Sequence, residues 1–217
     1  MLGRKKIAMI VAEFLGTAVL TLVVLAVSKS TIGIPYFVAL AAGLTIATMT
    51  LVLGSVSGAH LNPAITIGLW SARRIKTVPA VVYVAAQLLG GGAAYLLYTY
   101  FIGQHWKNAG HFDNQVLVAE AVGAFVFSMG WAAVVYKKFG ETKGAATVGA
   151  ALVLGVIVAS GVSGGGIINP AVALGLRSWV LGTYVLGPIL GAIIGFNLYG
   201  LLFAPVGKEA ESPKKKS

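Results

Sequence analysis

The tripeptide Asn-Pro-Ala occurs twice in the chain, at Asn62 and at Asn169, which lie 107 residues apart. The pairs Ala12-Glu13 and Ala119-Glu120 are separated by the same 107 residues. One short motif can recur by chance, but two unrelated pairs rarely share one spacing. The sequence therefore predicts a unit used twice: an apolar segment with a Glu, a second apolar segment, a loop of small residues, and Asn-Pro-Ala.

The composition predicts a lipid bilayer as the surrounding medium. Hydrophobic residues make up 58% of the 217-residue chain and charged residues 10%, and the mean hydropathy is +0.89. Six stretches are long and apolar enough to be spans: about 7–27, 36–54, 78–101, 116–136, 145–160 and 183–203. Because a crossing helix needs roughly 20 residues, the fifth stretch must borrow from the loop beside it. We expect an all-α membrane protein with one channel domain over 1–217 and repeats at about 7–101 and 116–203.

The first span is expected to be a retained helix rather than a signal peptide, since its apolar run is long and contains Glu13. The net charge of +10 reads as a topology signal and not as a nucleic-acid site. Thirteen of the sixteen basic residues fall on one side if both termini are cytoplasmic, which leaves only Lys29, Lys107 and Arg177 outside. The expected location is a prokaryotic plasma (inner) membrane, with 207–217 as a disordered cytoplasmic tail.

Each Asn-Pro-Ala segment is too short to cross the bilayer. Residues 63–71 and 170–178 would form helices of about 14 Å, half the membrane, so each must enter and return. An odd number of spans per repeat makes the repeats inverted. Asn is a favoured N-cap and Pro a favoured first helical residue. Two half-helix N-termini are therefore predicted to meet at mid-membrane, where their dipoles repel cations and the Asn amides donate hydrogen bonds.

The loops before these half-helices, 57–61 and 163–168, are non-helical at membrane depth. Such backbone is tolerated when it is buried in protein or lines a wet cavity, where its carbonyl groups become acceptors. The expected lining or vestibule residues are Gly58, Ala59, His60, Gly165, Ile167 and Arg177. The imidazole of His60 is interpreted either as a pore group whose titration gates flow or as a packing residue of the loop.

The chain resembles the major intrinsic protein family, the aquaporins and glycerol facilitators. The resemblance rests on 12–18 in the first helix, on 57–64 with the first Asn-Pro-Ala (Asn62, Pro63, Ala64), on Ala119-Glu120, on Asn169, Pro170 and Ala171, and on Gly187-Pro188. It implies six tilted helices with two half-helices, a homotetramer with one pore per subunit, and passive conduction of water or small uncharged solutes. No cofactor or metal is implied.

The chain departs from this family at the outer selectivity filter. Most members have an Arg directly after the second Asn-Pro-Ala, where this chain has Val172. Spacing from the two Asn residues gives the other filter positions as Ala42, Ile157 and Gly166. A small, apolar filter predicts passage of glycerol or urea as well as water. Ammonia or metalloid hydroxides are the alternative solutes. Arg177 stands where glycerol facilitators have a basic residue, but Ala173 replaces their Asp, so a solute contact and a helix C-cap both remain open.

Glu13 and Glu120 are the acids within the predicted spans. An intramembrane carboxylate can serve a proton relay, but support of its own re-entrant loop is the favoured interpretation, because loop support requires one acid in each inverted half. The chain has no Cys and no nucleophile–base constellation, which argues against an enzyme. A secondary transporter and an ion channel remain alternatives, although neither accounts for the paired Asn-Pro-Ala.

Overall fold

The computed structural model describes residues 3–108, 110–163 and 165–205. Within these ranges all regular structure is helical. The helices are α1 (Arg4–Ser28), α2 (Pro35–Ser57), α3 (Pro63–Ser71), α4 (Thr77–Ile102), α5 (Asn114–Lys137), α6 (Glu141–Ser163), α7 (Pro170–Gly175), the π-helix η1 (Leu181–Leu186) and α8 (Gly187–Leu202). Six segments of the described chain are long and apolar enough to cross a membrane: α1, α2, α4, α5, α6, and η1 with α8. The predicted six spans and two short helices are confirmed.

The ends of these helices follow local sequence signals. Proline stands at the first or second position of α2, α3, α7 and α8, where its missing N–H is tolerated. Asp113 caps α5 by accepting from the backbone N–H groups of Gln115 and Val116. Gly58 and Gly103 end α2 and α4 with positive φ angles of 93° and 64°, a conformation that suits glycine.

Two helix boundaries differ from the expected ones. The fifth span, predicted over 145–160, is extended at both ends, because α6 covers Glu141–Ser163. The second short helix was expected to reach residue 178 but ends at Gly175. Beyond it, Arg177 adopts a left-handed φ of 57°, and the N–H of Ser178 donates to the carbonyl of Ala173 at 2.9 Å. This 6→1 closure ends the helix.

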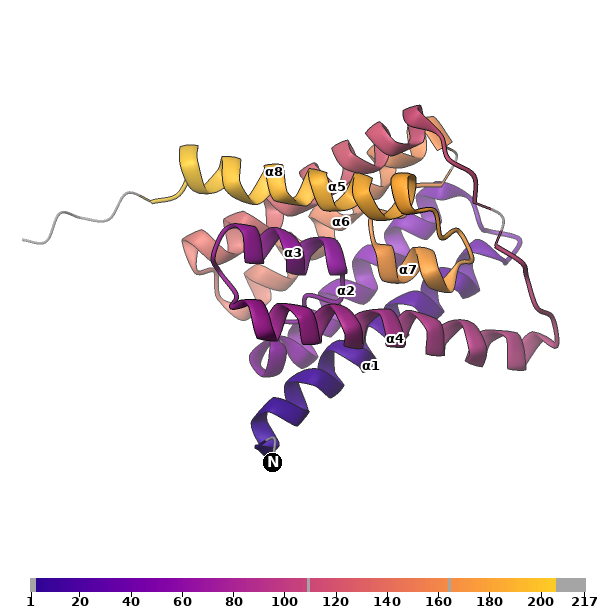
Figure 1. Ribbon diagram of the computed structural model, residues 1–217, viewed down its shortest axis with the longest axis horizontal. Coiled ribbons are helices and arrows are strands. Elements are labelled where there is room, and N and C mark those ends of the chain that lie inside the picture. The colour runs from indigo at the N-terminus through magenta and orange to yellow at the C-terminus, as the bar shows by residue number, and fades with distance from the viewer. Residues whose placement is uncertain (1–2, 109, 164, 206–217) are drawn as a thin grey trace, which may run out of the picture.

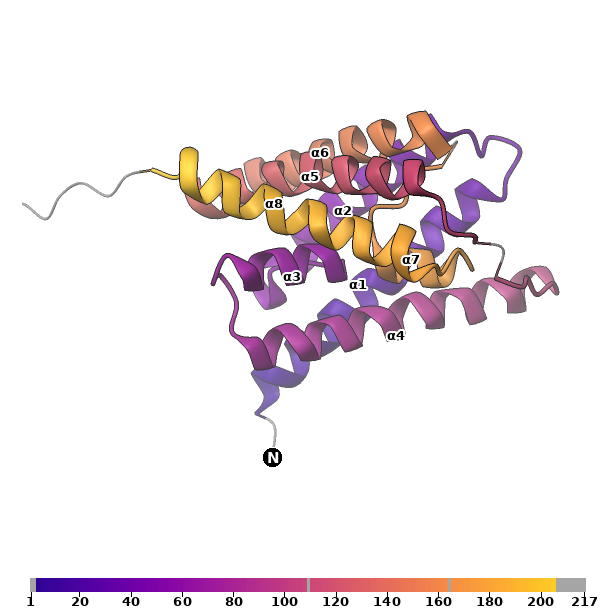
Figure 2. The same ribbon diagram turned by 45° about the horizontal axis from the view of Figure 1, so that its top comes forward.

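The helices pack in two matching sets. In the first half α1 packs against α2 and α4, and in the second half α5 packs against α6 and α8. The sets meet where α2 packs on α6. The short helices cross over, since α3 packs on α8 and α7 on α4. Figures 1 and 2 both show α3 and α7 roughly in line between α4 and α8, each entering from a different end of the bundle.

Glycines allow the closest of these approaches. A Cβ added to Gly90 would collide with the carbonyl oxygen of Phe14, and one added to Gly191 would collide with that of Ala121. Phe14 and Ala121 are again 107 residues apart. A Cβ on Gly91 would strike the carbonyl of Ala171 at the start of α7. At these positions the absence of a side chain lets the helices approach to backbone distance.

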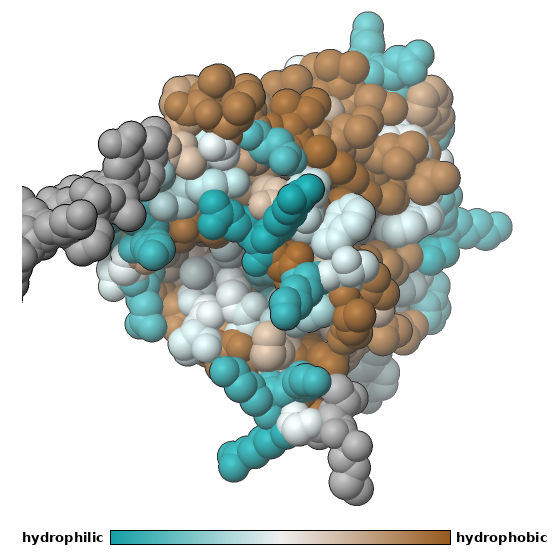
Figure 3. Space-filling view, turned by 60° about the vertical axis from the view of Figure 1, so that its left-hand side comes forward, coloured by the Kyte–Doolittle hydropathy of each residue, from teal (hydrophilic) through white to brown (hydrophobic). Residues whose placement is uncertain are grey.

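The outer surface separates into an apolar flank and charged ends. Large apolar side chains on the spans are exposed, including Leu44, Leu89 and Leu201 at 69%, 67% and 79%. Figure 3 looks toward the end where α1 begins and α8 finishes, with hydrophilic side chains gathered there and apolar ones on the flank. The described basic residues near this end belong to α1 and the α3–α4 and α5–α6 connections: Arg4, Lys5, Lys6, Arg73, Arg74, Lys76, Lys137, Lys138 and Lys143.

Candidate functional site: two half-helix starts and an outer cavity

The half-helix starts are tied together by their asparagines. The side-chain oxygen of Asn62 accepts from the N–H of Ala64 at 2.8 Å, and that of Asn169 accepts from the N–H of Ala171 at 3.0 Å. The amide nitrogen of each then donates across to the other loop: Asn62 to the carbonyl of Ile168 at 3.0 Å, and Asn169 to the carbonyl of Leu61 at 2.9 Å. An amide nitrogen carries two protons, so each Asn keeps one N–H for another acceptor.

The loops reach this arrangement through strained backbone. Leu61 and Ile168, which precede the two asparagines, have φ angles of 49° and 44°. Left-handed conformations are unfavourable for residues of this kind, above all for the β-branched Ile168. Strain of this type costs about 1–3 kcal/mol per residue and persists only where the surroundings enforce it. Two kinds of contact enforce this backbone: the hydrogen bonds of Asn62 and Asn169 to the opposite loop, and those of the Glu13 and Glu120 carboxylates to the N–H groups of Leu61 and Ile168.

Glu13 holds the first loop from the middle of α1. Its carboxylate is fully buried and accepts from the backbone N–H groups of His60 at 3.0 Å and Leu61 at 2.9 Å. It also accepts from the hydroxyl of Ser57 at 2.7 Å and from the side-chain amide of Gln87 at 2.8 Å. Four donors therefore meet the two oxygens of this one carboxylate.

Glu120 has the same relation to the second loop. Its buried carboxylate accepts from the N–H groups of Ile167 and Ile168, which correspond to His60 and Leu61 one repeat later. The backbone N–H of Gly166 donates to the hydroxyl of Ser160 at 2.8 Å. Both carboxylates therefore engage the backbone next to the half-helix starts, which is the geometry that loop support requires.

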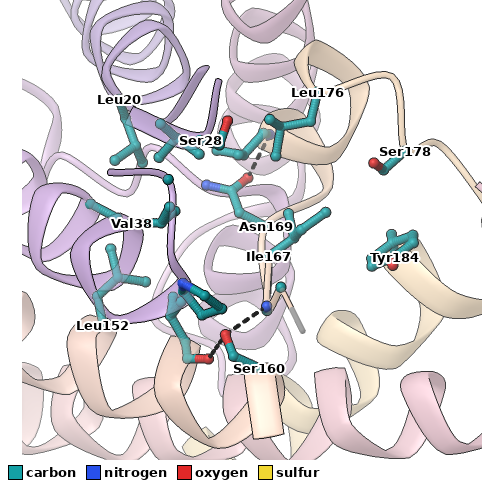
Figure 4. A pocket seen from close by; sticks show the side chains of 18 residues that line it. Leu20, Ser28, Val38, Leu152, Ser160, Ile167, Asn169, Leu176, Ser178 and Tyr184 are labelled. Atoms are coloured by element: carbon teal, nitrogen blue, oxygen red, sulfur yellow. Dashed lines mark hydrogen bonds between the residues drawn. The ribbon is translucent and has the colours of Figure 1, made fainter. Parts of the chain in front are cut away.

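A cavity of about 280 Å³ opens between the two halves and reaches Asn169. It lies toward the end of the bundle that carries the α1–α2 connection, since Ser28, Gly33 and Pro35 contribute to it. Its remaining lining consists of Leu20, Val24, Val38, Ala42, Leu152, Val156, Ser160, Gly165, Gly166, Ile167, Val172, Leu176, Ser178 and Tyr184. In Figure 4, Leu20, Val38 and Leu152 form one wall, Ser178 and Tyr184 lie opposite, and Asn169 and Ile167 lie between them.

Three of the four expected filter residues line this cavity, and the fourth does not. Ala42, Gly166 and Val172 are lining residues. Ile157 is not among them and is 38% exposed on the outside of α6, whereas its neighbour Val156 lines the cavity and is 3% exposed. Successive helical residues differ by about 100° in direction, so an error of one residue turns the side chain away from the lumen.

His60 lies with Gly58 and Ala59 in the first loop, away from the outer cavity. It is 7% exposed, and its Nδ1 is 3.2 Å from the hydroxyl of Thr66. Its ring meets the rings of Tyr83 and Trp131 edge-on, with centroids 5.3 Å and 5.8 Å away. Within the described ranges, no three His, Cys, Asp or Glu side chains come close enough together to hold a metal ion.

Arg177 does not line the outer cavity and instead binds the loop between α4 and α5. Its Nε donates to the carbonyl of Trp106 at 3.3 Å, and its guanidinium lies 5.2 Å from the ring centroid of Tyr95. It is half-buried and does not line the cavity. Arg177 therefore contributes no cation to the described lining of the cavity that contains Val172.

Sequence reasoning missed much of the cavity wall. Leu20, Val24, Leu152 and Val156 line it from α1 and α6, and Tyr184 lines it from η1. In the sequence these residues look like ordinary apolar positions of a span. A signal was available for α1, because Leu20 and Val24 lie one and two turns beyond the Glu13–Gly16 turn that faces the first loop. For η1 no sequence signal marks the π-helix.

The comparisons with known proteins agree with this geometry. The family model for the major intrinsic protein matches residues 3–203. Aquaporin Z from Photorhabdus laumondii is 34% identical over 223 residues, covering 89% of this chain and 96% of the relative. Aquaporin AqpM from Methanothermobacter thermautotrophicus is 30% identical over 186 residues, covering 76% of each.

Among solved structures, the aquaglyceroporin from Plasmodium falciparum matches with a TM-score of 0.73. It is 23% identical in sequence, and the match covers 91% of this chain and 96% of that one. This likeness supports the fold. The family match over nearly all of the chain, together with six candidate membrane spans and two cross-bonded Asn-Pro-Ala half-helices, identifies the protein as a multi-pass membrane protein of the major intrinsic protein family, whose relatives are aquaporin-type channels.

Proposed function

We propose that the chain forms a passive pore for water and small uncharged solutes such as glycerol or urea. The observation that carries the proposal is the small, apolar character of the residues at and near the expected filter positions. Ala42, Val156, Gly166 and Val172, here called the apolar ring, line the outer cavity, and no charged side chain is among its described lining residues. Without a guanidinium to fill the ring, a solute wider than water has room to pass.

The two walls of the cavity suit a molecule with a polar and an apolar side. Leu20, Val38 and Leu152 offer hydrocarbon, while Ser178 and Tyr184 offer hydroxyl groups on the opposite side (Figure 4). A polyol has such a division between its carbon chain and its hydroxyls, and urea and water need only the polar wall. The free N–H of Asn169 supplies a donor at the bottom of the cavity.

Exclusion of cations is assigned to the half-helix starts. The N-termini of α3 and α7 meet through the cross-bonds of Asn62 and Asn169. A helix N-terminus carries about half a positive elementary charge, and two of them face the same point. A cation must approach both while losing water, whereas a neutral solute does not.

Stopped-flow light scattering on reconstituted vesicles tests the proposal. Vesicles with the wild-type protein are expected to pass water, glycerol and urea faster than protein-free vesicles. Val172→Arg places a guanidinium in the ring and should reduce glycerol entry about tenfold while retaining water flux. Water flux without glycerol or urea entry in the wild type would refute the wide ring. Ammonia is measured in parallel, because the apolar ring also suits this weakly hydrated solute.

We propose further that the protein lies in a plasma (inner) membrane with both termini cytoplasmic, and that it assembles as a homotetramer. The gathering of basic residues at one end supports the orientation. Family resemblance supports the tetramer. Because the chain has no Cys, single substitutions Lys29→Cys and Lys76→Cys give a clean labelling test. An impermeant thiol reagent should label only Lys29→Cys in intact cells, and native mass spectrometry should show four copies.

A further inference from the structure

The inverted repeat matches residues that line the outer cavity with residues of the inner half, 107 positions away in the sequence. Leu20, Val24 and Ile167 line the outer cavity. The residues 107 positions away are Phe127, Trp131 and His60, which are 0%, 5% and 7% exposed. Three further lining residues, Asn169, Val172 and Leu176, correspond to Asn62, Ile65 and Leu69, all buried as well. By this correspondence, we expect the six inner positions to surround the continuation of the path beyond the asparagines.

The inner set is much bulkier than the outer one. Leucine and valine in α1 are replaced by the aromatic residues Phe127 and Trp131 in α5, and Ile167 is replaced by His60. The rings of His60 and Trp131 meet edge-on, with centroids 5.8 Å apart and planes at 82°. Where the outer half has a cavity, the inner half has large rings.

Trp131 has an unused donor. Its Nε1 is buried and has no hydrogen-bond partner within the described part of the chain. A buried indole N–H normally finds an acceptor. The matching residue of the other repeat, Val24, lines the outer cavity. We therefore infer that a solute passing through the pore is the acceptor for the Trp131 N–H.

His60 supplies the complementary acceptor. The hydroxyl of Thr66 has one proton, which goes to the carbonyl of Asn62 at 3.1 Å or to Oε1 of Gln87 at 3.3 Å. We assign the Thr66 proton to one of these oxygens and not to Nδ1 of His60, which lies 3.2 Å away, so that Nδ1 carries the proton of the neutral ring. With this assigned tautomer, the other nitrogen, Nε2, has a free lone pair.

We propose that Trp131 and His60 form a second selectivity filter in the inner half, which sets the upper size of the solute by ring bulk and selects molecules that both accept from Trp131 and donate to His60. Water, urea and short polyols satisfy both demands. The inference deepens the proposed channel function and rests on it: a wide outer ring admits solutes, and the aromatic pair limits them.

Variants of Trp131 test the inner filter in the same vesicle assay. Trp131→Ala should raise the ratio of glycerol to water permeability about fivefold and admit longer polyols such as xylitol, since it removes ring bulk. Trp131→Phe keeps most of the bulk but deletes the N–H, so it should leave xylitol excluded while raising the activation energy of water flux. If either variant fails to reconstitute, Trp131→Leu replaces it. Its ratio of glycerol to water permeability should lie between the ratios expected for Trp131→Ala and Trp131→Phe.

Trp70→Phe is the matched control. Trp70 is 46% exposed on the outside of α3, where its Nε1 donates to Thr77 at 3.0 Å, so the ratio should not change. Unchanged solute ratios in Trp131→Ala would overturn the inner filter, as would equal losses of water and glycerol flux, which a merely structural residue predicts. Failure of the channel proposal looks different, since the wild type itself would then conduct no better than empty vesicles.

Discussion

Gln87 donates to Glu13 at 2.8 Å across the interface between α4 and α1, and no such side-chain contact to Glu120 occurs among the described residues of α8. The repeat position of Gln87 is Pro188, judged from the matching glycines Gly90 and Gly191, and proline has no side-chain donor. The first loop is therefore held by an amide as well as by backbone. The two halves share a plan but differ in how firmly the loop is fixed.

Glu13→Gln is expected to destabilise the protein and reduce flux without any change in proton movement. The substitution replaces an acceptor of four hydrogen bonds with a group that presents an N–H to donors, and leaving a buried donor unsatisfied costs about 1–3 kcal/mol. Thermal unfolding in detergent measures the loss. The control is Glu141→Gln at the exposed start of α6. Proton-driven uptake in the wild type that disappears in Glu13→Gln would restore the relay interpretation.

Asn169→Asp is expected to admit cations. The change is nearly isosteric but places a negative charge where two half-helix dipoles now repel cations. A vesicle-trapped pH dye should report proton entry at least several-fold faster than with the wild type, while water flux stays within about threefold. Asn114→Asp, in the exposed first turn of α5, is the charge-matched control and should leave ion leakage unchanged.

Substitutions at Val156 and Ile157 distinguish the two faces of α6. Val156→Phe projects a ring into a cavity of about 280 Å³ and should reduce glycerol permeability about tenfold. Ile157→Phe adds the same ring to a side chain that is 38% exposed on the outside and should have little effect. The reverse ranking in stopped-flow assays would reinstate Ile157 as the filter residue.

Arg177→Leu separates the two interpretations of this residue. Since its Nε donates to the carbonyl of Trp106, the substitution should loosen the external loop while leaving glycerol and water permeability within about twofold. Hydrogen exchange of the 103–113 segment is the measurement, with faster exchange expected. A selective fall in glycerol flux with unaltered exchange would instead assign Arg177 a solute contact.

The sequence predicted the spans well because each carries an unmistakable apolar run between charged connections. It predicted the two half-helix starts because Asn and Pro have well-defined positions at helix N-termini. The end of α7 was wrong since nothing in the residue types announces the left-handed conformation of Arg177. The π-helical start of the last span was likewise invisible.

The two loops also differ at one hydrogen bond that the sequence does not announce. In the first half, the hydroxyl of Ser57 accepts from the N–H of Ala59 at 3.0 Å. The matching N–H in the second half, that of Gly166, donates instead to the hydroxyl of Ser160. Spacing from Asn169 likewise does not determine the rotation of α6, and this rotation decides that Val156 lines the cavity while Ile157 does not.

The crossed amide bonds also have a consequence for how the protein matures. The carbonyl of Leu61 finds its donor on Asn169, and Asn62 finds its acceptor on Ile168, so neither loop is complete without the other. During synthesis the amino-terminal half must wait, with polar backbone unmatched in a lipid environment, until the second short helix has been inserted. Completion of the first loop is thus a late step of folding that requires the synthesis of Asn169.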